Sequence, residues 1–170
     1  DSLEVPVDTR GLEFWNATFE GNGAWRLTGT LDVYVVDFIA GHLITNGQEI
    51  FTERVSIFDD NPKKLEIRNT YWHFEGRNSE YEEWYVGSGV LEEVLSDSSV
   101  IDLESDEAVM YLYDAFSFDK LIASNTSGNT RLDNYLNVNG QDSITFRELD
   151  LRNNTVFTGS MYGDTILLSA

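Results

Sequence analysis

The sequence predicts a folded domain of the all-β class, and three observations support this. Hydrophobic residues make up 41% of the 170-residue chain, enough for one domain with its own core. Aromatic and β-branched residues form short apolar runs that end at Gly, Asn, Asp or Ser, as strands do. A unit of strand, turn, strand and Gly recurs about every 20 to 26 residues, a spacing typical of stacked coils.

The expected strands are of ordinary length, and each is bounded by turn residues. They lie within residues 24–31, 32–40, 49–58, 65–74, 108–118, 143–151 and 165–168. Residues 91–95, Leu-Glu-Glu-Val-Leu, form the best short helical candidate. Coils of the stack are expected to begin near Leu12, Ala24, His42, Leu65, Leu91, Ser117 and Ser143.

Two parts of the sequence resemble each other. Residues 43–55 and 136–149 both contain Asn-Gly-Gln and an acid, then an apolar residue, Thr and Arg. Downstream, residues 65–76 match residues 149–159. The Asn residues at these corners either stack their amides from coil to coil or make tight hairpin turns. They are Asn46, Asn69, Asn139 and Asn153.

These motifs resemble the coils of repetitive right-handed β-solenoid (parallel β-helix) surface proteins, the adhesin-like proteins of Bacteroidota type. Segments 12–76 and 131–168 carry the resemblance best, whereas residues 80–130 fit it poorly. The resemblance implies a structural or adhesive role and no catalytic residues.

Charge and composition exclude several partners. Thirty acidic and 11 basic residues give a net charge of −19, which repels nucleic acid and anionic membranes. The chain has no cysteine, so disulfides, thiolate metal sites and a cysteine nucleophile are excluded. No stretch is apolar enough for a membrane-spanning segment, and the absence of cysteine favours bacterial secretion. We expect an extracellular or cell-surface location.

The search for chemistry leaves weak candidates. His42 and His73 do not form a metal-binding motif, and no nucleophile elbow is present. Asp32 and Asp37 are expected on opposite faces of one strand because their spacing is odd. Ligand-binding candidates combine aromatic rings with carboxylates: Trp72, Trp84, Glu82 and Glu83. Calcium candidates are hard oxygen ligands in acidic clusters: Asp59, Asp60, Asp102 and Asp106.

The preferred interpretation is one β domain over residues 1–170, itself complete or a fragment of a longer repetitive chain. Its expected fold is a right-handed parallel β-solenoid of irregular coils. The alternative is an antiparallel β-barrel or sandwich, such as a lipocalin-like barrel with Gly23-Ala24-Trp25 on its first strand.

We expect the chain to be an extracellular structural or adhesive module of a bacterial surface or secreted protein that carries out no catalysis. No cofactor is expected other than calcium. The alternatives are a carbohydrate-binding or carbohydrate-active β-helix, such as a glycan lyase or hydrolase, and a small-ligand-binding barrel. Expected partners are further copies, neighbouring domains of the same chain, or polysaccharide. Because the chain is apolar up to its last residues, we also expect end-to-end self-association.

Overall fold

The fold is all-β and is built from parallel strands. The computed structural model describes residues 3–58, 61–75, 83–87, 91–105, 108–112, 117–125, 129–134, 144–152, 154–158 and 161–168. These residues form 18 strands and no helix. Each pairing between described strands is parallel. The antiparallel barrel or sandwich is therefore wrong, because its neighbouring strands would run in opposite directions.

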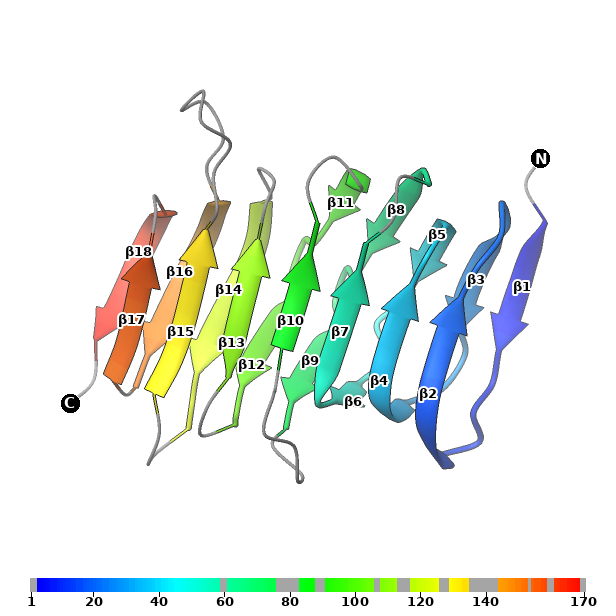
Figure 1. Ribbon diagram of the computed structural model, residues 1–170, viewed down its shortest axis with the longest axis horizontal. Helices are drawn as coiled ribbons and strands as arrows, with labels where there is room; N and C mark the ends of the chain where they lie inside the picture. Colours follow the sequence, from blue (N-terminus) through cyan, green and yellow to red (C-terminus); the bar gives the residue numbers. More distant parts are fainter. Residues whose placement is uncertain are drawn as a thin grey trace.

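The strands lie side by side along the long axis of the molecule, with β1 and β18 at opposite ends (Figure 1). A five-stranded sheet has the order β1-β3-β5-β8-β11. Its strands are β1 (Glu4–Val7), β3 (Ala24–Leu27), β5 (Gly41–Ile44), β8 (Lys63–Glu66) and β11 (Leu91–Leu95). Each strand thus pairs in parallel with one whose residues lie 18 to 29 positions away in the sequence.

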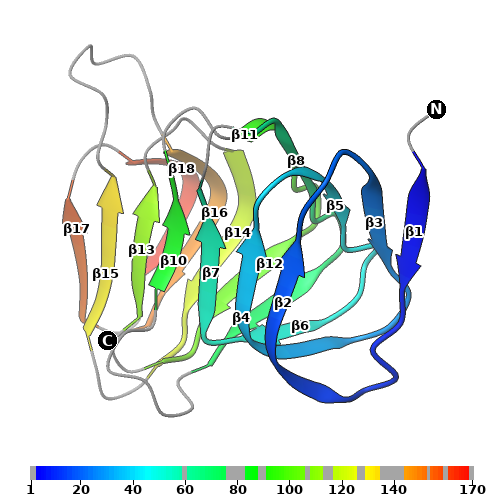
Figure 2. The ribbon, with the colours of Figure 1, turned by 45° about the vertical axis from the view of Figure 1, so that its right-hand side comes forward.

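A second, longer sheet curls so that its two halves face each other (Figure 2). One half contains β6 (Ile50–Thr52), β9 (Tyr71–Phe74), β12 (Val100–Leu103), β14 (Ser117–Ala123), β16 (Ile144–Leu151) and β18 (Met161–Leu168). The other contains β7 (Arg54–Ile57), β10 (Glu83–Val86), β13 (Val109–Leu112), β15 (Asn129–Asn134) and β17 (Asn154–Thr158). β4 (Leu31–Phe38) joins the halves, and β2 (Glu13–Phe19) pairs with β4.

The bend in β4 corrects one expectation. Its first residues pair with β6, and residues from Val35 onward pair with β7. At the bend, Tyr34 and Val35 are both only partly buried, so the alternation of buried and exposed positions shifts by one residue. Asp32 and Asp37 consequently both lie off the core-facing side, although their odd spacing predicted opposite faces.

Rows of inward-facing apolar residues fill the space inside the curled sheet. In one row each residue is the register partner of the next, and all are buried: Leu31, Ile50, Trp72, Ile101, Leu121 and Leu149. A strand buries its inward face only when the next strand of the stack covers it. This dependence makes the core continuous along the axis.

Most of the expected coil starts coincide with strand starts, but the single strands expected within residues 49–58 and 65–74 are each two strands, β6 with β7 and β8 with β9. Ala24, Leu91 and Ser117 begin β3, β11 and β14, while His42 and Leu65 fall within two residues of the starts of β5 and β8. Ser143 immediately precedes β16. Leu12 differs, because it precedes β2 of the long sheet and not a strand of the five-stranded sheet.

The helix expected at residues 91–95 is wrong, because these residues form β11. The strand pairs with β8, and the register shifts between Leu91 and Glu93. Such a bulge adds one residue to the strand. Leu91 and Val94 can therefore both pack against the core at a spacing of three, which in sequence imitates a helical period.

Tight turns connect the two sheets at one corner of the stack. The amide of Gln48 donates to the Thr45 carbonyl at 3.0 Å, and Asn46 and Gly47 both have positive φ. Asn-Gly therefore does make a tight turn, but it joins β5 to β6, which are not paired with each other. Asn69 and Ser98 have positive φ after β8 and β11. The Asn46 side chain donates to the Leu27 carbonyl at 3.2 Å and thereby links this turn to the end of β3.

Part of the sequence repeat lies beyond the described residues. Segment 135–143, which holds Asn139, is outside them, as is Asn153. The expectation that residues 43–51 and 136–144 occupy equivalent positions in the stack therefore stays a prediction.

Candidate functional site

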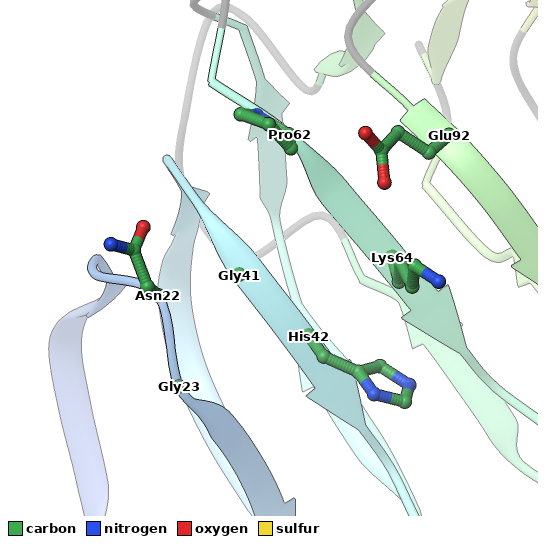
Figure 3. A pocket seen from close by; sticks show the side chains of 7 residues that line it. All are labelled: Asn22, Gly23, Gly41, His42, Pro62, Lys64 and Glu92. Atoms are coloured by element: carbon green, nitrogen blue, oxygen red, sulfur yellow. The ribbon is translucent and has the colours of Figure 1, made fainter. Parts of the chain in front are cut away.

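A shallow hollow of about 340 Å³ lies on the outer side of the five-stranded sheet. It is formed where β3, β5 and β8 begin, with β11 at its far rim (Figure 3). The residues that line it are Asn22, Gly23, Gly41, His42, Pro62, Lys64 and Glu92. Four separate segments of the chain thus contribute to this one hollow.

Glycine creates the floor of this hollow. Gly41 has φ of +92°, and a Cβ atom there would lie 2.5 Å from the Gly21 carbonyl oxygen and 2.5 Å from Trp25 Cζ3. At Gly23, a Cβ would lie 3.1 Å from the Leu3 carbonyl oxygen. Only residues without side chains allow the three chain segments to approach so closely.

The His42 and Lys64 side chains of the hollow each lie near a carboxylate. His42 and Lys64 are register partners on β5 and β8, and both side chains project from the outer face (Figure 3). His42 Nε2 lies 3.6 Å from Glu66 Oε2, and Lys64 Nζ lies 3.6 Å from Glu93 Oε2. These groups are partly exposed, so water weakens their attraction. The hollow therefore offers donors and acceptors to a polar ligand without a strong charge of one sign.

A second polar group lies on the outer face of the long sheet. The rings of Phe51 and His73 stack with centroids 4.3 Å apart and planes inclined by 8°. The ring of Tyr71 also stacks on His73, at 4.3 Å and 27°. The ring faces that make these contacts are not open for stacking on a sugar.

Two hydrogen bonds hold these rings against the next strand. The Tyr71 hydroxyl donates to Asp102 Oδ2 at 2.7 Å, and His73 Nδ1 hydrogen-bonds Glu104 Oε1 at 2.6 Å. Burial of the Tyr71 phenol, followed by its hydrogen bond to Asp102, raises the pKa of Tyr71 above its ordinary value. Tyr71 therefore keeps its proton and remains the donor of this pair throughout the neutral pH range.

Two of the ligand-binding candidates predicted from the sequence, Trp72 and Trp84, lie in the core. Trp72 and Trp84 are 1% and 0% exposed, and their rings lie 4.7 Å apart inside the curled sheet. Neither ring faces a surface where a ligand could stack. Glu82 lies outside the described residues, and Glu83 is in β10 with its side chain outside the description.

The calcium candidates are not brought together in the described part of the chain. Asp102 is buried and accepts the Tyr71 hydrogen bond, whereas Asp59, Asp60 and Asp106 lie outside the described residues. No group of three described acidic or histidine residues could hold a metal ion. Within the same residues, no helix is long and apolar enough to cross a membrane. Calcium binding stays a prediction.

Sequence reasoning missed the hollow because its residues are far apart in the chain. Four chain segments that lie side by side in the fold bring together Asn22, His42, Lys64 and Glu92. One local signal was present: Gly41 directly precedes His42 at the start of a strand, where glycine often marks a close approach of two backbones.

Comparisons with protein-family models, with curated proteins and with solved structures found no match to this chain.

Proposed function

We propose that this chain is a right-handed β-solenoid segment that serves as a structural and adhesive module of an extracellular or cell-surface protein. It carries out no catalysis. The observation that carries the proposal is the use of charged side chains: most described ion pairs join neighbouring strands of the stack. Charges that hold successive coils together suit a stalk better than a catalytic cleft.

Five ion pairs of Arg or Lys and two histidine–carboxylate contacts connect residues that are 22 to 31 positions apart. They are Glu4–Arg26, His42–Glu66, Lys64–Glu93, Arg68–Asp97, His73–Glu104, Asp119–Arg147 and Lys120–Glu148. Each surface pair contributes modestly to stability, about 0.2 to 1 kcal/mol. Their regular placement opposes sliding of one coil over the next, while the excess of acidic residues keeps the surface soluble.

The pair of Asp119 and Arg147 gives a pH-dependent prediction. A hydrogen bond from the Arg147 guanidinium lowers the pKa of Asp119 below its ordinary value. The contribution of a carboxyl with a lowered folded-state pKa is complete above the unfolded-chain pKa and is lost as pH falls through the folded-state value. We expect Asp119→Asn to lower the free energy of unfolding at pH 7 by less than about 1 kcal/mol.

Urea unfolding of Asp119→Asn and the parent chain at pH 7 and at acid pH measures this difference. The two proteins should differ at pH 7 and converge once Asp119 is protonated in the parent chain. Asp97→Asn is the matched control, because Asp97 is 82% exposed beside Arg68 and should matter less. An undiminished gap between parent and Asp119→Asn at acid pH would argue against the ion pair.

The second candidate function is carbohydrate binding or cleavage, and the hollow at His42 and Lys64 favours it. Its mixture of amide, imidazole, ammonium and carboxylate groups could hydrogen-bond one sugar unit. The hollow is open and Lys64 is already paired with Glu93, which supports weak retention of a glycan more than a reaction. This alternative predicts that Lys64→Ala reduces any retention of polysaccharide.

A polysaccharide panel assay separates the two functions. It measures retention of the protein and newly formed reducing ends together, with calcium and with a chelator. We expect inertness or retention without new reducing ends. Reproducible cleavage would overturn the non-catalytic proposal, and retention only with calcium would direct attention to the acidic clusters around Asp59 and Asp102.

A further inference from the structure

Exposed large apolar side chains gather at the two ends of the stack. At the β1–β2 end they are Leu3, Val5, Leu12, Phe14 and Trp15, and on β18 they are Ile166, Leu167 and Leu168. Among the described residues, Phe58 after β7 is the one such side chain elsewhere. The exposed apolar side chains of the described residues are thus concentrated on or directly beside β1, β2 and β18, the strands at the two ends of the molecule (Figure 1).

One inward row of the core reaches both ends. It runs through successive register partners from Leu31 by way of Trp72 to Leu149, and Ile166 of β18 is the partner of Leu149. Leu12 directly precedes Glu13, the partner of Asp32, so the same register sets Leu12 beside Leu31. Members of the row are at most 2% exposed inside the stack, but Ile166 is 55% and Leu12 is 58% exposed.

A second inward row ends in the same way. Phe14 is the partner of buried Val33 at the β2 end, and Leu168 is the partner of buried Leu151 at the β18 end. Phe14 is 41% and Leu168 is 78% exposed. The spacing agrees at both ends: Leu12 and Phe14 are two residues apart, as are Ile166 and Leu168.

The backbone edges at the two ends are also complementary. All described strands are parallel, so β18 presents one edge of its strand and β1 and β2 present the opposite edge. An open edge of unpaired N–H and C=O groups readily accepts another strand. Opposite edges of a parallel stack match each other, whereas two identical ends do not.

We infer that a second copy of this chain docks head to tail, with β18 of one copy against β1 and the first half of β2 of the next. In this register Ile166 packs on Leu12, and Leu168 packs on Phe14. The contact is heterologous and does not close on itself, so it produces linear chains of molecules. The inference rests on the structural role proposed above and gives that role a partner and a register.

Charge at the join permits this contact. In the same register the outward residue Leu167 meets Glu13, so this position does not set like charges against each other. The net charge of −19 nevertheless makes two copies repel at long range. Docking should therefore strengthen as salt is added, since salt screens repulsion and leaves apolar packing intact.

Disulfide trapping tests the register, because the chain has no cysteine of its own. Two single variants, Leu12→Cys and Ile166→Cys, are prepared, one of them with a mass tag, and are mixed and oxidised in high salt. Strands of a sheet lie about 4.8 Å apart, within the Cα separation that a disulfide bridges. We expect mixed dimers that contain one copy of each variant, and little product from either variant alone.

Sedimentation of the protein without cysteine substitutions provides the second measurement. The weight-average mass should rise about two-fold or more with concentration in high salt. Ile166→Lys should abolish the rise, and Phe58→Lys, an equal change at an exposed site away from the ends, should preserve it.

Three outcomes overturn the inference: homodimers of either cysteine variant as the main product, a strictly monomeric parent chain at high concentration, or equal effects of Ile166→Lys and Phe58→Lys. These outcomes are separate from the polysaccharide assay. A monomeric protein that forms no reducing ends would remove the head-to-tail contact and leave the non-catalytic role standing, whereas cleavage by an associating protein would do the reverse.

Discussion

Replacing Trp72 by alanine is expected to lower the free energy of unfolding by about 3 to 5 kcal/mol. Trp72 is 1% exposed and packs against Trp84 with ring centroids 4.7 Å apart. Its indole Nε1 has no hydrogen-bond partner among the residues that the structure describes, so the expected loss comes from packing and from the cavity that remains. The neighbouring strands are fixed by their own pairings and cannot close around an empty volume of this size.

Denaturant unfolding followed by circular dichroism measures the effect, with Trp15→Ala as the matched control. Trp15 is 73% exposed and touches Tyr34 on one side, so its removal should cost less than about 1 kcal/mol. If Trp72→Ala unfolded like the parent chain and lost retention on polysaccharide, the placement of Trp72 in the core would be refuted.

The contrast between these two tryptophans shows what the sequence could and could not predict about a site. Trp72 stands in an alternating stretch, and alternation alone sets it opposite to His73. The sequence does not say which of the two faces is inside, and the nearby aromatic and acidic residues suggested a ligand surface. The pairing of Trp72 with buried Ile50 and Ile101 shows that Trp72 faces the core. These partners lie far away in the sequence, so the neighbouring residues do not reveal the pairing.

The all-β class and the positions of most expected coil starts could be predicted because each depends on local patterns, whereas the breaks that divide residues 49–58 and 65–74 into two strands each were missed. The exceptions arise where a strand departs from a simple period of two. The bulge in β11 imitated a helix, and the bend at Tyr34 in β4 moved Asp37 off its expected face. Both irregularities are fixed by the neighbouring strands of the stack and not by the residues themselves.

The acidic clusters illustrate a different limit. Asp102 was grouped with its sequence neighbours as an oxygen ligand, yet its carboxylate is buried and bound to the hydroxyl of Tyr71, 31 residues earlier. Stacking brings together residues one coil apart, so sequence neighbours are a poor guide to chemical neighbours in this fold. The hollow around His42 follows the same logic, since its lining is drawn from four turns.

Gly41→Ala is expected to lower the free energy of unfolding by at least about 3 kcal/mol, because two costs combine. The φ of +92° is strained for any residue with a Cβ. The new methyl group would also lie 2.5 Å from the Gly21 carbonyl oxygen and 2.6 Å from that of Gly23. Backbone carbonyls cannot rotate away as a side chain can, so β3 and β5 must separate.

Gly11→Ala distinguishes the two costs. Gly11 has φ of +66°, but a Cβ there meets no atom within 4 Å, so only the conformational cost of about 1 to 2 kcal/mol applies. The difference between the two variants in urea unfolding therefore measures how tightly the chain is packed beneath the hollow. Equal losses would mean that the turns before β3 and β5 can move apart freely. The floor of the hollow would then be deformable, and an argument from its present shape to a ligand would fail.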